Sequence, residues 1–580
     1  MRGLCAALSV AAALLLAGAL YFPALRGAFI SDDRVVVAGN PATESPAAAM
    51  LAFARPFWHG LKSANPYYRP LPVLSWALDR SVAGGSTIPY HASSIALHAI
   101  NALLAAWLVG VLIGWRRALP GAGAAGMAIA AALVVAHPIH TEPVAAIYGR
   151  PDLLSATGVL LFLNFALRGR AIAAFVALGA ALLSKESAIL IPLLAPVIFG
   201  AGRELLARSG AGRATATAAP LPALHRHPLL LGVAGAGIVG GIYLSLRHAA
   251  LGALVDPGPV SRLDNPLAAA GSVERWMTPF AVAARSAALW LRPTPLCADR
   301  GFDVTPIASG PGDPAVLPGA ILIAGAVAAA ALLAARRSPW ALVPAAAILT
   351  WLPGSGLPVL SPVIMAERLL YMPSIFACVA AGGLAAGMAR RAAGWSPRGR
   401  SALPPFERGG LWAALALMVA VATIFAGLTR SRAADFADEI SFYRADTLAC
   451  PRSAKARYNL GNALARAGRL EEAAGEFERS GAIAPWLGVA HANLGATLLG
   501  LGRVDPAGEA YRRAIEADPA LVSARASLAG VLFMQGRSSE ALVEAEAALR
   551  LRPSPEDAGQ IRELIAWIRN ASQARPLTPP

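Results

Sequence analysis

Two adjacent carboxylates, Asp32 and Asp33, follow the first apolar stretch of the chain, in the sequence FISDDRVV. Carboxylates at a membrane edge are costly unless they have a role. Neighbouring carboxylates repel each other, so one of the pair is expected to have a raised pKa and to serve as a general base. The alternative is an Asp-rich turn that caps a juxtamembrane helix.

Basic residues lie at other boundaries of the apolar stretches. Arg69 follows two tyrosines in YYRPL, Lys185 precedes Glu186 in LLSKES, and Arg368 opens an apolar stretch in MAERLLYM. A guanidinium group matches the geometry of phosphate, so these positions suit an anionic phosphate ligand. The alternatives are an arginine that extends its charged end to water and a simple Lys185–Glu186 ion pair.

A third polar segment reads HPIHTEPVAAIYGRPD and holds His140, Glu142, Arg150 and Asp152. Histidines and a glutamate this close in sequence leave a divalent metal site open. The spacing differs from the helical H-E-x-x-H arrangement, and two prolines prevent a regular helix through it. A polar loop that orients substrate is therefore the preferred interpretation.

Apolar stretches long enough for membrane helices separate these sites. The chain is 56% hydrophobic and only 14% charged, which excludes an ordinary cytosolic enzyme. Eleven spans are predicted. The two spans within 171–200 could also be one helix with a break. The spans are near 4–22, 93–114, 121–137, 152–167, 171–183, 187–200, 228–246, 316–335, 339–353, 368–388 and 411–428.

Arginine positions predict the orientation of these spans. With a cytoplasmic N-terminus, every inner loop carries arginines, as the positive-inside rule requires. These are Arg116–Arg117, Arg168–Arg170, Arg203–Arg226, Arg336–Arg337 and Arg390–Arg408. The net charge of +16 is then mostly a topology signal, and the polar sites share the outer side, with 23–92 as a large outer loop. Residues 276–292 carry Arg285 in their middle and are assigned to an interfacial or re-entrant helix on the outer side. Residues 4–22 also fit a cleaved signal peptide.

A repeat fills the chain after residue 430. Pro451, Pro485, Pro519 and Pro553 recur every 34 residues, as do Gly468, Gly502 and Gly536. The period and these residue types are typical of tetratricopeptide (TPR) repeats, and about three copies are present over 431–570. A generic alanine-rich helical bundle is the alternative. The four cysteines have no metal-like spacing.

Taken in order, several segments resemble the transmembrane and TPR repeat-containing O-mannosyltransferases, polytopic glycosyltransferases of the GT-C superfamily. The segments are FISDDRVV, YYRPLPVLSWALDR, HPIHTEPVAAIYGRPDLLSA, LLSKESAI, LWLRPTPLCAD and MAERLLYMPSI, followed by the TPR repeats. The resemblance implies an all-α fold, with a GT-C-like membrane domain over 1–430. It also implies sugar transfer, mannose in the family, from a polyprenyl-phosphate donor on the non-cytoplasmic side.

The resemblance also assigns the site residues. It places the acidic motif of the family's first outer loop on Asp32 and Asp33, with Asp32 as the base and Asp33 supporting it. His140, Glu142 and Asp152 then orient substrate or acceptor. Four basic residues are expected to bind the donor phosphate, because of their charge and their side of the membrane. They are Arg69, Arg150, Lys185 and Arg368. No metal ion or other cofactor is required, because fixed cations can stabilise the leaving phosphate.

The expected acceptor is a protein Ser or Thr hydroxyl, and the transfer is expected to invert the sugar's configuration. The arginine-biased, alanine-rich composition indicates a bacterial source, and hence the inner membrane with a periplasmic site and TPR domain. Two alternatives remain open. One is a GT-C enzyme that modifies a glycan or lipid while the TPR repeats bind a partner protein, and the other is a non-catalytic membrane anchor for a TPR scaffold. Nucleic acid is not an expected partner.

Overall fold

A computed structural model describes residues 2–57, 67–114, 120–198, 228–254, 260–357, 359–393 and 404–573. Every regular element in these ranges is a helix, which confirms the all-α prediction. Packing divides the chain into two compact units, Met1–Ala298 with Ile307–Phe442, and Asp299–Pro306 with Tyr443–Pro580. The predicted boundary near residue 430 lies inside helix α16, and the division itself follows Phe442.

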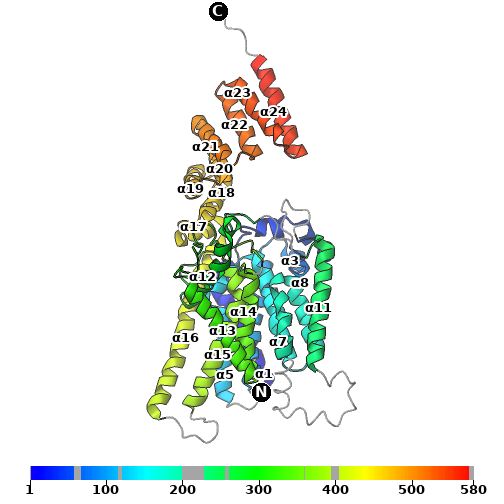
Figure 1. The fold of residues 1–580 in the computed structure, drawn as a ribbon, viewed down its shortest axis with the longest axis vertical. Coiled ribbons are helices and arrows are strands. Elements are labelled where there is room, and N and C mark those ends of the chain that lie inside the picture. Colours follow the sequence, from blue (N-terminus) through cyan, green and yellow to red (C-terminus); the bar gives the residue numbers. More distant parts are fainter. Residues whose placement is uncertain are drawn as a thin grey trace, which may run out of the picture. The chain divides into compact units, whose positions relative to one another are not determined.

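The first unit is a bundle of helices that run side by side (Figure 1). Each predicted span corresponds to helical structure, because helices satisfy their own backbone hydrogen bonds in an apolar environment. The helices are α1 (Arg2–Tyr21), α4 (Ile88–Leu112), α5 (Pro120–Ala136), α7 (Arg150–Ala166), α8 (Ala171–Ser184), η8 (Glu186–Leu194), α11 (Pro228–Leu251), α13 (Val316–Ala335), α14 (Leu342–Trp351), α15 (Tyr371–Ala392) and α16 (Pro405–Ala434).

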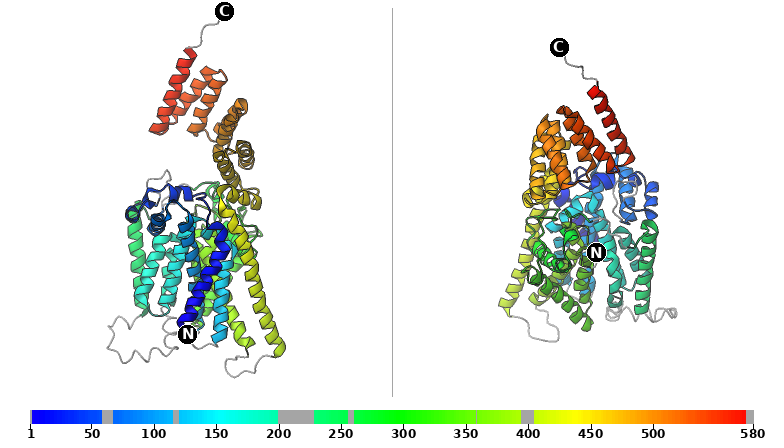
Figure 2. Two further views of the ribbon diagram at one scale, coloured as in Figure 1. Left: turned by 180° about the vertical axis from the view of Figure 1, so that it is seen from behind. Right: turned by 45° about the horizontal axis from the view of Figure 1, so that its top comes forward.

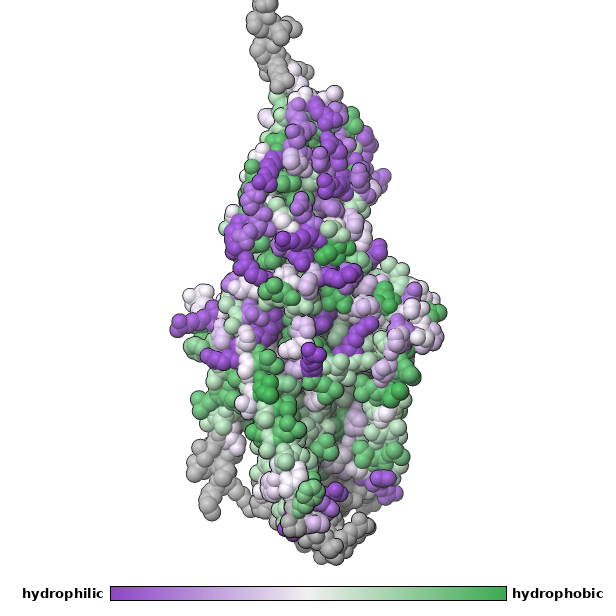
Figure 3. Space-filling model, turned by 90° about the vertical axis from the view of Figure 1, so that its left-hand side faces the viewer, coloured by the Kyte–Doolittle hydropathy of each residue, from purple (hydrophilic) through white to green (hydrophobic). Residues whose placement is uncertain are grey.

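Several of these helices have the length and composition of membrane spans. Among the described residues, four helices are long and apolar enough to cross a membrane: Ile88–Leu112, Val316–Ala335, Glu367–Ala392 and Phe406–Ala437. A fifth span is possible if the bent pair Gly121–Ala136 and Pro138–Ala145 counts as one. Shorter apolar helices in the described part of this unit are Ser9–Ala24, Ala171–Ser184, Glu186–Ile198 and Pro339–Gly354. The count of eleven stays a prediction. The face of this unit that Figure 3 shows is largely hydrophobic, as expected for contact with lipid. Arg116, Arg117 and the arginines of 203–226 lie outside the described residues.

The segment after α1 folds at the end of the bundle opposite the N-terminus (Figure 2). The sequence predicted only a loop here, but the segment contains α2 (Pro46–Ala49) and α3 (Pro70–Ala83). Trp76 of α3 is fully buried against Val36 and Val37, which gives this region a core of its own. The predicted interfacial segment forms α12 (Ser272–Leu291).

The second unit contains three helical hairpins that match the predicted repeat. They are α18 (Ala454–Arg466) with α19 (Leu470–Ile483), α20 (Gly488–Gly500) with α21 (Val504–Ala517), and α22 (Val522–Met534) with α23 (Ser538–Arg550), followed by α24 (Pro555–Gln573). The turns hold Gly468, Gly502 and Gly536 at φ of 74°, 74° and 80°, a conformation that favours glycine. Hydrophilic residues dominate the surface of these helices (Figure 3).

Gly461 tests the hairpin packing. A Cβ atom at this position would lie 2.7 Å from the Phe477 ring, whereas a Cβ atom at Gly475 in α19 would meet nothing within 4 Å. Gly461→Ala should therefore destabilise the repeat by about 1–3 kcal/mol through overpacking. Gly475→Ala should stabilise it by about 0.5–1 kcal/mol, because it removes a flexible residue from a helix. Hydrogen exchange of α18 and α19 amides in the full chain measures both effects, and equal effects would contradict the packing.

Candidate active site

Asp32 and Asp33 lie on a tight turn that gives them opposite environments. Ser31 adopts a left-handed conformation with φ of 49°, which costs energy in a residue other than glycine and is common at functional sites. Asp32 is exposed, while Asp33 is fully buried. The turn thus leaves one carboxylate accessible to a substrate and places its neighbour in the interior.

Asp33 links the first outer segment, which follows α1, to the second, which precedes α7 (Arg150–Ala166). Its carboxylate oxygens accept hydrogen bonds from the backbone N–H groups of Tyr148 at 2.5 Å, Ile30 at 3.3 Å and Ile147 at 3.4 Å. Burial raises the pKa of the Asp33 carboxyl from 3.8 to about 8, against the opposing effect of these N–H groups. Asp33 therefore acts as a structural link, and Asp32 is the carboxylate of the two that remains accessible.

Glu142 holds Arg368 at the same end of the bundle. The buried Glu142 carboxylate accepts from Arg368 Nη1 at 2.6 Å and from the Arg368 backbone N–H at 2.9 Å. Tyr148 donates its hydroxyl to Glu142 at 3.2 Å, and the Arg368 guanidinium lies 5.7 Å from the centre of the Tyr148 ring. Gly149 permits this arrangement, because a Cβ atom there would lie 2.4 Å from the Pro143 carbonyl oxygen.

Asp32 lies within electrostatic range of this pair. Its charge acts on Arg368, Tyr148 and Tyr67, so the exposed carboxylate and the Glu142–Arg368 pair belong to the same region of the first unit.

Two further ion pairs occupy the break between α8 and η8. Lys185 Nζ lies 2.6 Å from Asp152 Oδ1, and Arg69 forms a two-point contact with Glu186, including a 2.8 Å bond from Nε. The Arg69 guanidinium also stacks 4.2 Å from the centre of the Tyr67 ring. Lys185 has an extended backbone between the two helices, as the sequence allowed for a broken helix over 171–200.

Arg150 is saturated by protein partners. Its side chain is 1% exposed and forms a 2.9 Å ion pair with Asp79 of α3. Its other nitrogens donate to Ser94 Oγ at 2.9 Å and to the Tyr90 carbonyl oxygen at 2.6 Å. This geometry favours a positioning role for Arg150 over the predicted contact with the donor phosphate.

His140 lies in the helix core instead of facing the carboxylates. Its Nδ1 atom lies 2.7 Å from the Val134 carbonyl oxygen, and its Nε2 atom lies 2.6 Å from Ser374 Oγ. The ring packs against Tyr371, with centroids 4.9 Å apart. His140 therefore anchors the bend that carries Glu142, and the predicted contact with substrate is not favoured. In the part of the chain that the structure describes, no group of three or more His, Cys, Asp or Glu side chains is placed to hold a metal ion.

Exposure separates the four predicted phosphate ligands. The Arg368 side chain is 26% exposed, Arg69 14%, Lys185 8% and Arg150 1%. Arg368 is thus the most accessible of the four cations. The sequence analysis missed Asp79 and the role of Tyr148. Asp79 is the single acidic residue of α3, and this is the signal that could have identified it.

The fold and site define a polytopic membrane protein with paired charges at one end of its bundle and a TPR array. A tetratricopeptide repeat family matches residues 489–521. Protein O-mannosyl-transferase TMTC1 of Mus musculus is 35% identical over 173 residues, which cover 28% of this chain and 18% of the relative. Protein O-mannosyl-transferase TMTC4 of Mus musculus is 26% identical over 484 residues, which cover 76% of this chain and 62% of the relative.

The chain is therefore a relative of the TPR-containing protein O-mannosyl-transferases. It spans about a fifth of the length of the TMTC1 proteins and 62% of mouse TMTC4. Among solved structures, the MamA protein is 19% identical and covers 25% of this chain and 88% of its own, with a TM-score of 0.20.

The raised pKa of Asp33 predicts a pH dependence. The folded state retains a proton that the unfolded chain releases above about pH 4, so the free energy of unfolding should fall as pH rises from about 4 to 8. Asp33→Asn should flatten this fall, whereas Glu44→Gln, which changes an exposed carboxylate in the same segment, should not. Thermal unfolding of the full chain at pH 5 and pH 8 measures the difference, and parallel profiles for Asp33→Asn and wild type would contradict it.

Arg150→Gln should destabilise the fold, because it leaves Asp79 without its cation in a largely buried position. The expected loss is about 3–5 kcal/mol, the range for breaking one side of a buried ion pair. Arg34→Gln is the control, since the Arg34 side chain is 50% exposed and pairs with Glu439 at 3.4 Å; an exposed pair contributes at most about 1 kcal/mol. Thermal unfolding in detergent separates the two, and a stable Arg150→Gln protein that only loses donor binding would restore the phosphate role.

Proposed function

We propose that this protein is a membrane glycosyltransferase that moves a sugar, mannose by its relatives, from a polyprenyl-phosphate carrier to a Ser or Thr hydroxyl of a polypeptide. The observation that carries the proposal is the exposed Asp32 carboxylate in the same region as the Glu142–Arg368 pair. The similarity to protein O-mannosyl-transferases supports protein O-mannosylation.

An apolar groove supports a lipid-linked donor. It has a volume of about 370 Å³ and runs between α8 and α11, lined by residues such as Phe175, Leu183, Val239 and Leu246. Tyr243 belongs to the same lining, and its ring lies 6.1 Å, centre to centre, from the ring of Tyr68. Tyr68 precedes Arg69 in the chain, so the Arg69–Glu186 pair lies near the groove, an arrangement that suits a hydrocarbon chain with an anionic head.

Asp32 is the base in the proposed reaction. The acceptor hydroxyl gives its proton to the Asp32 carboxylate while its oxygen attacks the anomeric carbon of the sugar. A new bond forms between that oxygen and the anomeric carbon, and the bond from the anomeric carbon to the phosphate oxygen breaks. Because attack and departure occur on opposite faces, the configuration inverts. Glu142 and Asp152 hold the cations in this scheme.

The leaving group determines what the cations must do. The donor is a phosphodiester with one negative charge, and the product is a phosphate monoester that gains a second charge as the bond breaks. Arg368 is fixed by Glu142 and partly exposed, so it can stabilise that developing charge without reorganisation. Arg69 and Lys185 lie further along the path of the lipid head. Fixed cations thus provide the charge stabilisation, and no metal ion enters the proposed step.

The positive-inside distribution of arginines supports a reaction on the non-cytoplasmic side. In a bacterial inner membrane that side is periplasmic, and the carrier is a bacterial polyprenyl phosphate. The TPR array then presents or binds the polypeptide acceptor, since such solenoids offer extended surfaces to peptides.

Asp32→Asn tests the proposed base. The amide cannot take the acceptor proton, so transfer should fall by about 10²–10⁴-fold. The measurement uses the full chain in nanodiscs with polyprenyl-phosphate-[³H]mannose and a library of Ser- and Thr-containing peptides.

Glu44→Gln is the matched control, because it removes another exposed carboxylate of the same segment and should retain activity. Full transfer by Asp32→Asn would refute the role of the base. Absence of transfer by the wild-type protein would contradict the proposed function itself.

A further inference from the structure

The second unit contains a segment that precedes the repeats by nearly 140 residues in the chain. Residues Asp299–Pro306, from the connection between α12 and α13, pack with the TPR helices and belong to the same compact unit. The segment has the sequence DRGFDVTP, with two acidic residues on either side of an aromatic one. The repeat array therefore contacts an extended segment of its own chain in the way that it would contact a bound peptide.

Three side chains of the array contact this segment. Arg452 donates to both carboxylate oxygens of Asp303, at 2.8 Å and 2.9 Å. Lys455 Nζ lies 3.1 Å from Asp299 Oδ2. The Trp486 and Phe302 rings meet edge to face, with centroids 5.2 Å apart and an interplanar angle of 88°. Each acidic residue thus has a cation, and the aromatic residue between them has an aromatic partner.

The segment also has an ordered conformation of its own. Thr305 Oγ1 donates to the Arg300 carbonyl oxygen at 2.6 Å, and the Val304 N–H donates to the Gly301 carbonyl oxygen at 3.2 Å. Asp303 has a φ of 64°, which turns the chain sharply at the residue that Arg452 contacts. These contacts pre-organise the segment and lower the entropy cost of docking.

The contacting residues occur once in the array. The position of Arg452 is taken by Trp486 in the second repeat and Ala520 in the third, and the position of Lys455 by Val489 and Ser523. The repeats are otherwise regular, so packing between helices does not require these cations. Lys455 is also one of only three lysines in the chain. The cations Arg452 and Lys455 therefore give the start of the first repeat a docking chemistry that the corresponding positions of the other two repeats lack.

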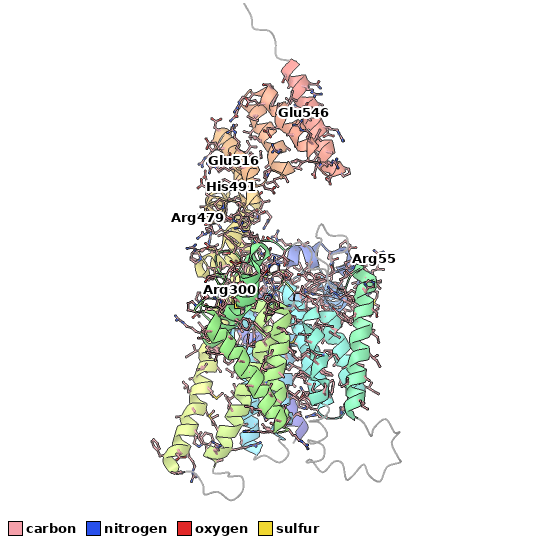
Figure 4. All side chains as sticks on the ribbon, viewed as in Figure 1. Arg55, Arg300, Arg479, His491, Glu516 and Glu546 are labelled. Carbon is pink, nitrogen blue, oxygen red and sulfur yellow. The ribbon has the colours of Figure 1, made fainter. Side chains whose placement is uncertain are left out.

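We propose that Arg452, Lys455 and Trp486 form a docking surface for an extended peptide with an aromatic residue between two acidic ones, and that Asp299–Pro306 occupies this surface in the resting protein. The surface charges of the array, several of which are labelled in Figure 4, otherwise pair mainly within and between its own helices. Cys297, two residues before the segment, and Cys450, two residues before Arg452, are both disulfide-bonded. The segment is thus tethered more closely than by a flexible linker alone, and it competes at an effective concentration of at least the order of millimolar. An external peptide of the same chemistry consequently binds only when the segment leaves.

A peptide-binding measurement on the full chain in detergent tests occupancy. The probe is a fluorescein-labelled peptide with the sequence of residues 299–306. The triple variant Asp299→Asn, Phe302→Ala, Asp303→Asn vacates the surface without altering it, so it should bind the probe at least tenfold more tightly than wild type. Adding Lys455→Glu to that variant should abolish binding, whereas adding Arg503→Glu, on an exposed arginine of the next hairpin, should not.

Equal probe affinity in wild type and the triple variant would overturn the proposal, as would absence of binding to the triple variant. Hydrogen exchange gives a second readout that needs no peptide. The amides of residues 299–306 should exchange at least tenfold faster in Arg452→Glu, Lys455→Glu than in wild type, and unchanged exchange would also overturn it. Arg503→Glu should leave that exchange as it is in wild type.

Discussion

The cost of burying charge decides the arrangement of the outer end of the bundle. An ionised side chain close to a hydrocarbon environment must be paired or must reach water. Four cations meet this requirement through carboxylates that come from other segments of the chain. The pairs are Arg69–Glu186, Lys185–Asp152, Arg150–Asp79 and Arg368–Glu142. Because each pair joins separate segments, the pairs fix how the first and second outer segments lie against the helix bundle.

The same pairing separates structural cations from available ones. The guanidinium group of Arg150 donates its hydrogen bonds to Asp79, to serine hydroxyls and to a carbonyl oxygen, so its charge is neutralised within the fold. Arg368 keeps a quarter of its side chain exposed while Glu142 holds it from behind. A cation oriented in this way is ready for a charge that appears only during reaction, which is how electrostatic catalysis works. Asp32 is exposed in the same region, and the proposed reaction uses it as the base while Arg368 stabilises the leaving group.

The sequence predicted the fold well because its signals are local. Runs of apolar residues mark the helices, and the 34-residue period marks the hairpins, whose three pairs of helices the structure confirms. The helix α3 was missed, since its prolines and charged residues resemble a loop.

The candidate site was predictable by residue type but not by partner. FISDDR and MAERLL indicated where charge occurs, yet no local pattern showed that Arg368 pairs with Glu142, 226 residues away. The burial of Asp33 beneath the exposed Asp32 depends on N–H groups of the second outer segment. His140 similarly looked like a substrate ligand until its hydrogen bonds to Val134 and Ser374 were visible. Such contacts depend on tertiary structure.

The central claim is that Arg368 holds the phosphate of the departing lipid. Equilibrium binding of a polyprenyl monophosphate and of the uncharged polyprenol to the full chain in nanodiscs tests this most directly. The account predicts that Arg368→Gln weakens binding of the monophosphate at least tenfold and leaves binding of the polyprenol unchanged. Equal losses for both lipids, or unchanged binding of the monophosphate, would contradict it.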